Sequence, residues 1–221
     1  MNKKHVKRAG VFAVCLLIGS SIVVETQNSH RLKESNEQLT KALAIEKEGR
    51  GEEQWLYNLA VEFQTNPLIV DLVDHFAKEH IGREEENEWR LVQNHRSLTY
   101  LFLSLIQVES NHEPNAIGDN GKARGLTQIW VTTAQQYEPE VTDIELLNPT
   151  TNIRVGLTHY HELLKRYKGN PWLANLAWNR GERRVDDLIS YGQSPANGYG
   201  ERVFTAALSF NREILAQWRN R

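Results

Sequence analysis

Residues 98–110 read LTYLFLSLIQVES, an apolar run that ends in a carboxylate and a hydroxyl. The apolar side chains recur three and four residues apart, which is the spacing of one face of a helix. The stretch therefore predicts an amphipathic helix that packs on a core. The residues of this face are Leu98, Leu101, Phe102, Leu105 and Val108.

Glu109 stands at the end of this apolar face. Because Leu98, Phe102, Leu105 and Glu109 follow one another at helical spacing, they project on the same side. A carboxylate that ends an apolar stripe is partly desolvated, and desolvation favours its protonated form. Glu109 is therefore a candidate general acid near neutral pH. The periodicity also allows a second interpretation, in which this glutamate turns out into solvent at the helix end.

Asn-Pro pairs mark the starts of further helices, since asparagine caps a helix and proline suits its first turn. They occur at residues 66–67, 148–149 and 170–171, and a last apolar stripe runs from Val203 to Trp218. No long alternation of apolar and polar residues predicts a strand. A turn-forming sequence, GDNG at residues 118–121, indicates a hairpin within a loop-rich insert at 111–125. The fold class is thus mainly α with a small hairpin insert.

Composition excludes several classes of protein. Hydrophobic residues make up 40% and charged residues 24% of the 221 residues, as in globular proteins. The single cysteine rules out an intrachain disulfide and a cysteine-rich zinc site. There is no phosphate-binding glycine loop or calcium loop, and His159 and His161 would point apart on a helix as solvated side chains. We expect no cofactor, no metal and, with a net charge of -2, no nucleic-acid partner.

The first eight residues carry a charge of +4, which leaves -6 on the remainder of the chain. An uncharged apolar run follows at residues 9–24, and this pattern is typical of a signal or signal-anchor segment. A buried core helix is the alternative. Cleavage of the segment and lipidation at Cys15 both stay open. We expect an uncleaved single-pass anchor in the inner membrane with the cationic end in the cytoplasm. The predicted parts are residues 1–25 as anchor, 26–94 as polar stalk and accessory helices, and 95–221 as the main domain.

Five short blocks follow one another in the second half of the chain. They are ESNHEPNA at 109–116, GKARGLTQI at 121–129, NIRVG at 152–156, LAWNRG at 176–181 and YGERV at 199–203. Each block alone is a weak signal. The ordered set resembles the soluble lytic transglycosylase-like family, which is related to goose-type lysozyme, and the resemblance spans about residues 95–210.

The resemblance implies a lysozyme-like helical fold and cleavage of peptidoglycan glycan strands outside the cytoplasm. The bond cut would be the β-1,4 linkage between N-acetylmuramic acid and N-acetylglucosamine, with formation of 1,6-anhydromuramic acid. Glu109 matches the family's catalytic acid and would act alone as acid and then base. Glu113, Asp119, Asp143 and Glu145 are candidates for the second carboxylate that a hydrolytic scheme needs. A hydrolytic muramidase and a non-catalytic glycan-binding scaffold are the alternatives.

The resemblance also implies a set of substrate-binding residues. Gln128 and Asn179 offer amides suited to an N-acetyl group. Ser110 would hold Glu109 or a sugar, with a plain helix-end role as the alternative. Tyr199 would lie near the cleft, and Trp178 replaces a tyrosine of the family pattern. If residues 29–94 dock a partner, an anchored enzyme of this kind would open the wall locally for an envelope-spanning assembly or for growth.

Overall fold

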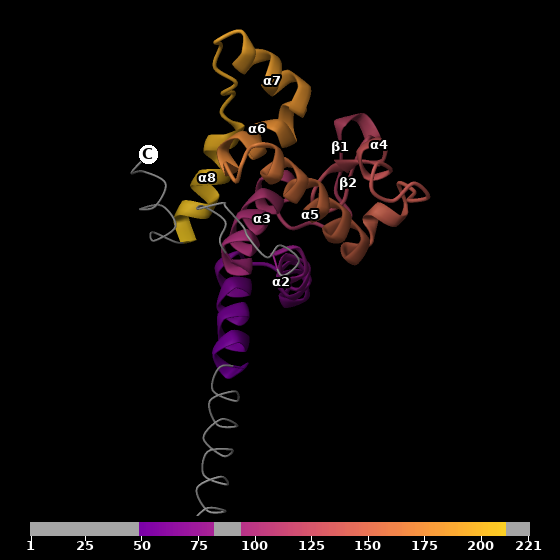
Figure 1. The fold of residues 1–221 in the computed structure, drawn as a ribbon. Helices are drawn as coiled ribbons and strands as arrows, with labels where there is room; N and C mark the ends of the chain where they lie inside the picture. The colour runs from indigo at the N-terminus through magenta and orange to yellow at the C-terminus, as the bar shows by residue number, and fades with distance from the viewer. Residues whose placement is uncertain (1–48, 82–93, 211–221) are drawn as a thin grey trace, which may run out of the picture. The chain divides into compact units, whose positions relative to one another are not determined.

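The structure is a computed structural model that describes residues 49–81 and 94–210, with side chains as far as residue 207. The chain divides into two compact units, Met1–Trp55 and Leu56–Arg221. Residues 49–62 are helical, and the elements named in Figure 1 from α2 onward belong to the second unit. The family-like region and residues 56–81 thus share one compact unit. The domain boundaries at residues 25 and 94 stay predictions.

The predicted anchor at residues 1–25 lies outside the described residues, as does the stalk as far as residue 48. Among the helices that are described, none is both long enough and apolar enough to cross a bilayer. The anchor therefore stays a prediction from the sequence.

Helix α3 (His95–Ser110) lies at the centre of the second unit. It packs against α2 (Pro67–Ile81) and α8 (Tyr199–Phe210), and α2 also packs against α5 (Pro149–Arg166). Every side chain of α3 from Leu98 to Ile106 is buried. The predicted helix and its packing on the core are confirmed, but its middle, from Leu98 to Ile106, is enclosed on all sides and not on one face alone. The hydroxyls of Thr99 and Ser104 bond to carbonyls of their own helix, which removes the cost of burying them.

The three Asn-Pro helix starts are confirmed. Asn66, Asn148 and Asn170 each accept hydrogen bonds from backbone N–H groups at the starts of α2, α5 and α6 (Pro171–Arg180). The described helices also include α7 (Glu182–Ser190), which the sequence did not predict. Only Val185 and Leu188 of its nine residues are buried, and it starts at Gly181 without a side-chain cap. Such a short polar helix carries little periodic signal.

The predicted hairpin is present and forms a three-stranded antiparallel sheet in the order β1-β2-β3. The strands are β1 (Ile117–Gly118), β2 (Ala123–Arg124) and β3 (Ile129–Trp130), and a 3-10 turn at Asp119–Gly121 joins the first two. Asn120 and Gly121 of this turn have positive φ, as the GDNG sequence indicates. The irregular region continues through α4 (Val131–Ala134) to a 3-10 turn at Glu145–Leu147. Figure 1 shows the hairpin and α4 beside α5, with α7 beyond the end of α6.

The side chain of Asn152 ties the hairpin region to α5. Its Nδ2 donates to the carbonyls of Arg124 at 2.9 Å and Leu146 at 2.8 Å. Its Oδ1 accepts from the backbone N–H of Thr127 at 2.9 Å and from the Thr127 hydroxyl at 2.8 Å. The amide is fully buried, so all of its donors and acceptors must be satisfied within the protein. Three separate segments are thereby fixed to one side chain.

Two glycines of the motif blocks make room for this arrangement. A Cβ on Gly125 would lie 2.4 Å from the Leu146 carbonyl oxygen and 2.5 Å from Asn152 Nδ2, and Gly125 has φ +69°. A Cβ on Gly156 would lie 2.9 Å from Thr127 Cγ2. Both positions therefore require glycine for close approach of the chain.

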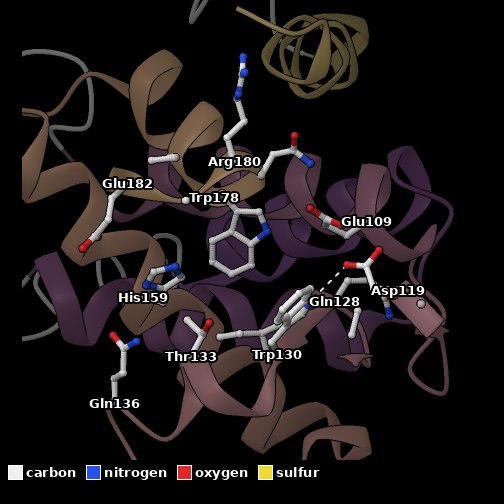
Figure 2. A pocket seen from close by; sticks show the side chains of 16 residues that line it. Glu109, Asp119, Gln128, Trp130, Thr133, Gln136, His159, Trp178, Arg180 and Glu182 are labelled. Atoms are coloured by element: carbon white, nitrogen blue, oxygen red, sulfur yellow. Dashed lines mark hydrogen bonds between the residues drawn. The ribbon is translucent and has the colours of Figure 1, made fainter. Parts of the chain in front are cut away.

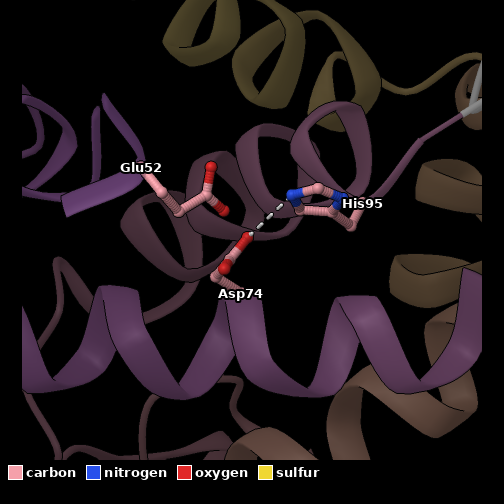
Figure 3. Close-up of side chains that lie close together, drawn as sticks. All are labelled: Glu52, Asp74 and His95. Atoms are coloured by element: carbon pink, nitrogen blue, oxygen red, sulfur yellow. Dashed lines mark ion pairs between the residues drawn. The ribbon is translucent and has the colours of Figure 1, made fainter. Parts of the chain in front are cut away.

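Asp74 is a buried carboxylate at the contact between α2 and α3. Lys78 Nζ lies 2.7 Å from its Oδ2, and His95 Nε2 lies 3.7 Å from its Oδ1, as Figure 3 shows for the histidine. The Thr99 hydroxyl is 3.2 Å from Oδ1. A buried carboxylate is tolerated when it is compensated in this way, so these contacts set how α2 meets α3.

Replacing Asn152 with aspartate should destabilise the protein severely. The change removes two donors and leaves the carbonyls of Arg124 and Leu146 facing a carboxylate oxygen. We expect a loss of about 2–5 kcal/mol in the free energy of unfolding, measured by urea denaturation. Asn120→Asp, at an exposed turn residue, is the matched control and should change it by less than about 0.5 kcal/mol. Equal stability of the two variants would contradict this role for Asn152.

Candidate functional site

A cavity of about 620 Å³ lies where the end of α3, the hairpin, α5 and the α6–α7 junction meet. Figure 2 shows its lining, in which acidic, aromatic and amide side chains face one another. Of the residues that the sequence proposed for a site, Glu109, Gln128, Trp178 and Asn179 line this cavity. Residues from all over the second half of the chain are thus brought to one place.

Glu109 lies in the last turn of α3 and faces the cavity. Burial raises the pKa of its carboxyl from 4.5 to about 7, and the nearby Asp119 carboxylate adds to the rise. Hydrogen bonds from Tyr199 and Trp178, and the positive charge of Arg202, act in the opposite direction. The carboxyl is therefore partly protonated at neutral pH, which allows both donation and acceptance of a proton. Of the two interpretations from the sequence, the structure selects the desolvated one.

Tyr199 lies at the start of α8 and is 2% exposed. Its phenol hydroxyl donates to Glu109 Oε1 at 2.5 Å. Burial and the neighbouring carboxyl raise the pKa of this phenol, so it stays a donor. Tyr199 thus contacts Glu109, although it is not among the residues that line the cavity. Its predicted contact with a sugar stays a prediction.

Trp178 contacts an aromatic cluster that the sequence did not reveal. The His159 ring centroid lies 5.1 Å from that of Trp178, and the Tyr137 hydroxyl is 2.9 Å from His159 Nδ1. Burial lowers the pKa of His159 to about 4, so the imidazole is neutral. The prediction of solvated histidines is wrong, since His159 lines the cavity and His161 is buried. Their spacing could not show this, because α5 is covered by neighbours on both sides.

The three remaining predicted residues lie in different situations. Gln128 Nε2 donates to the carbonyls of Ala116 at 3.0 Å and Gly125 at 2.9 Å, which leaves Oε1 for a ligand. Asn179 is exposed, and its Oδ1 accepts from Asn197 at 2.7 Å. Ser110 does not line the cavity, and its hydroxyl donates to the Ile106 carbonyl within α3. The geometry favours the helix-end alternative for Ser110.

Two residues of the cavity lining at the end of α6, Asn179 and Arg180, form a clasp with residues 195–197. Arg180 Nη1 donates to the Pro195 carbonyl at 2.8 Å, and the Asn179–Asn197 bond lies beside it in the chain. These contacts join residues 179–180 to residues 195–197, on either side of α7. The two ends of the segment that contains α7 are thus held next to each other.

Of the four candidates for a second carboxylate, only Asp119 lines the cavity. Its Oδ2 accepts a hydrogen bond from Trp130 Nε1 at 3.0 Å (Figure 2). Asp143 pairs with Arg124, and Glu145 accepts bonds from Thr142. Glu113 is exposed and accepts from the Asn115 N–H. Glu182 also lines the cavity and was not proposed from the sequence.

The family model of the transglycosylase SLT domain matches residues 89–199, half of the chain. The chain belongs to this family. The match confirms the resemblance seen in the five sequence blocks and ends at Tyr199, the residue that contacts Glu109. A comparison with curated proteins finds no match to the chain.

Two solved structures resemble the SLT-family chain. An inactive mutant of lytic transglycosylase Slt from Pseudomonas aeruginosa is 21% identical over 53% of this chain, with a TM-score of 0.47. The 70 kDa soluble lytic transglycosylase of Escherichia coli is 19% identical over 61% of this chain, with a TM-score of 0.48. The matches cover 22% and 23% of those chains.

Replacing Glu109 with glutamine should stabilise the protein at alkaline pH. The folded pKa of about 7 lies above the ordinary 4.5, so the folded state binds more protons and wild-type stability falls between about pH 4.5 and 7. Glutamine carries no charge, so the variant does not lose this stability as the pH rises. We expect Glu109→Gln to melt above wild type at pH 8, with the difference shrinking toward pH 5.

The matched control is Glu182→Gln, because Glu182 lines the same cavity but is exposed. It should leave the melting temperature nearly unchanged at both pH values. A Glu109→Gln variant that is no more stable than wild type at pH 8 would contradict the burial of this carboxylate.

Proposed function

We propose that the protein cleaves peptidoglycan as a lytic transglycosylase, with Glu109 as general acid and then general base. The observation that carries the proposal is a carboxyl with a pKa near 7 at the wall of an open, polar cavity. Membership of the transglycosylase SLT domain family supports the reaction type. The substrate is the β-1,4 bond between N-acetylmuramic acid and N-acetylglucosamine.

The reaction needs one proton to leave and return. Protonated Glu109 gives its proton to the glycosidic oxygen, and the bond from that oxygen to C1 of muramic acid breaks. The C6 hydroxyl oxygen of the same sugar then bonds to C1, and its proton passes to the Glu109 carboxylate. The products are a free sugar hydroxyl and a 1,6-anhydro end, and Glu109 is restored. An internal nucleophile benefits from a high effective molarity.

The neighbours of Glu109 suit this exchange. Donation from Tyr199 and Trp178 stabilises the carboxylate after it has lost its proton. The Asp119 carboxylate opposes that state and also favours positive charge that develops at C1. Neutral His159 holds the indole of Trp178 without adding charge to the cavity. Burial and Asp119 on one side, and Tyr199, Trp178 and Arg202 on the other, keep the two protonation states of Glu109 close in free energy.

Hydrolysis of the same bond by water is the second candidate, and Asp119 is the observation that favours it. In a hydrolytic scheme a second carboxylate activates water or attacks C1. A glycan-binding scaffold without turnover is the third candidate. The products of digestion distinguish all three.

Digestion of purified peptidoglycan tests the proposal. Wild type should release muropeptides with 1,6-anhydro ends, which mass spectrometry detects as one water lighter than the reducing form. Glu109→Gln should lower the rate about 10²- to 10⁴-fold, whereas Glu113→Gln, an exposed residue outside the cavity, should cut at the wild-type rate. Reducing ends would indicate a muramidase, and binding without release would indicate a scaffold.

We also propose that residues 1–25 anchor the chain in the inner membrane, with the SLT domain on the periplasmic side. The cationic flank and the apolar run at 9–24 support this placement, which brings the cavity to its substrate. A role beside an envelope-spanning assembly would follow from such anchoring and from residues 29–94.

Lysines in the apolar run should release the protein from the membrane. Each lysine at the centre of a spanning helix costs about 2.5–3.5 kcal/mol. We expect the double variant Leu16→Lys, Leu17→Lys to leave the carbonate-resistant membrane fraction and appear in the soluble fraction. The control double variant Asn36→Lys, Gln38→Lys should stay in the membrane fraction. Equal retention of both double variants would contradict the anchor.

A further inference from the structure

A second groove lies next to the Glu109 cavity and shares Trp130 with it. Its volume is about 530 Å³, and it is formed by the hairpin turn, α4 and residues 142–143. Trp130 lines this groove and the Glu109 cavity alike. A ligand that extends out of the Glu109 cavity across Trp130 therefore enters the second groove.

Trp130 is a fixed and exposed platform. Its side chain is 42% exposed, although it is one of the largest apolar residues of the chain. The Nε1–H donates to Asp119 Oδ2, and pairing of Trp130 with Ala123 in the sheet fixes its backbone. An indole held by its edge presents a flat face that loses little freedom on binding. Such a face suits the apolar face of a sugar ring.

Lys122 places its positive charge over the Trp130 ring. Its Nζ lies 5.2 Å from the centroid of the Trp130 ring. Among residues 49–81 and 94–210, no carboxylate forms an ion pair with Lys122. The other cation of the groove, Arg124, is compensated by Asp143 at 2.9 Å. The groove thus has one cation that is available to a ligand.

We propose that the groove is a second subsite for peptidoglycan, in which Trp130 stacks on a sugar and Lys122 pairs with a stem-peptide carboxylate. The inference rests on the proposed function and deepens it. The glycan of peptidoglycan carries no charge of its own, whereas the peptides attached to muramic acid end in carboxylates. Lys122 therefore makes cleavage sensitive to the charge of the stem peptide.

The test compares intact peptidoglycan with peptidoglycan whose free carboxyl groups have been amidated chemically. Wild type should cleave the intact material with a kcat/KM about two- to fivefold higher, as expected for a solvent-exposed ion pair. Lys122→Gln should lose this preference, so that the ratio falls toward one. Lys168→Gln, an exposed lysine that lines neither cavity, should keep the wild-type ratio. High salt should reduce the preference of wild type.

The platform has its own variants. Trp130→Ala should lower kcat/KM about three- to tenfold on both materials. Trp130→Phe keeps a flat ring and should retain most of the wild-type kcat/KM. Circular dichroism of each variant reports whether the helical domain still folds. A Lys122→Gln variant with the wild-type ratio, or a wild type without preference, would overturn the subsite.

Binding measurements separate this inference from the proposed function. Isothermal titration with soluble muropeptide oligomers compares Glu109→Gln with the double variant Glu109→Gln, Lys122→Gln. The double variant should bind about two- to fivefold more weakly. If wild type binds in this charge-dependent way but cuts nothing, the proposed function fails and the subsite stands. If wild type cuts and Lys122 affects neither rate nor binding, the subsite fails alone.

Discussion

The buried amide of Asn152 is the constraint on which the rest of the site depends. Its four hydrogen bonds join the hairpin, the turn at Thr127 and the 3-10 turn at residues 145–147 to helix α5. These segments contain little regular structure, so their backbone groups need partners from elsewhere. The hairpin carries Asp119 and Trp130, and α5 carries His159. One side chain therefore joins the hairpin side of the cavity to the α5 side.

Glu109 carries a carboxyl group that is more stable when hydrated, and the fold buries it at the cavity wall. The chain achieves this burial by enclosing α3 on all sides and by placing Glu109 where that enclosure ends. Donors from α6 and α8 limit the rise in its pKa to about 7. Without them the carboxyl would be a weaker acid and would give up its proton less readily, and with full hydration it would be ionised at neutral pH and have no proton to give. The value reflects a balance between burial and hydrogen bonding.

The sequence predicted the helical class, three helix starts, the hairpin turn and the position of Glu109 on an apolar face. These are local features, because capping, turn chemistry and periodicity act within a few residues. Burial from a second side is not local, so periodicity alone predicts one buried face for α3 and a solvated His159. For Gln128 and Ser110 the structure adds hydrogen bonds to backbone carbonyls that the motif blocks do not indicate. A motif shows which side chains recur but not whether their polar atoms bond to backbone carbonyls.

The resemblance to a family identified more residues of the site than periodicity and composition could. It selected Glu109, Trp178 and Tyr199 from positions far apart in the chain, and the structure brings these three side chains together. The aromatic cluster that contacts Trp178 has no sequence motif of its own. Tyr137 and His159 lie 22 residues apart and contact through a fold-dependent hydrogen bond, so only the structure could reveal them.

The clasp between residues 179–180 and 195–197 has a consequence for how this domain can change over time. Because the ends of the α7 segment are joined at its base, most of its length can vary without moving the end of α6. The entropic cost of lengthening a closed loop grows only slowly with its length, and exposed segments tolerate insertions. The α7 segment is thus a place where the domain could acquire or lose a whole structural module while Trp178 keeps its position against Glu109.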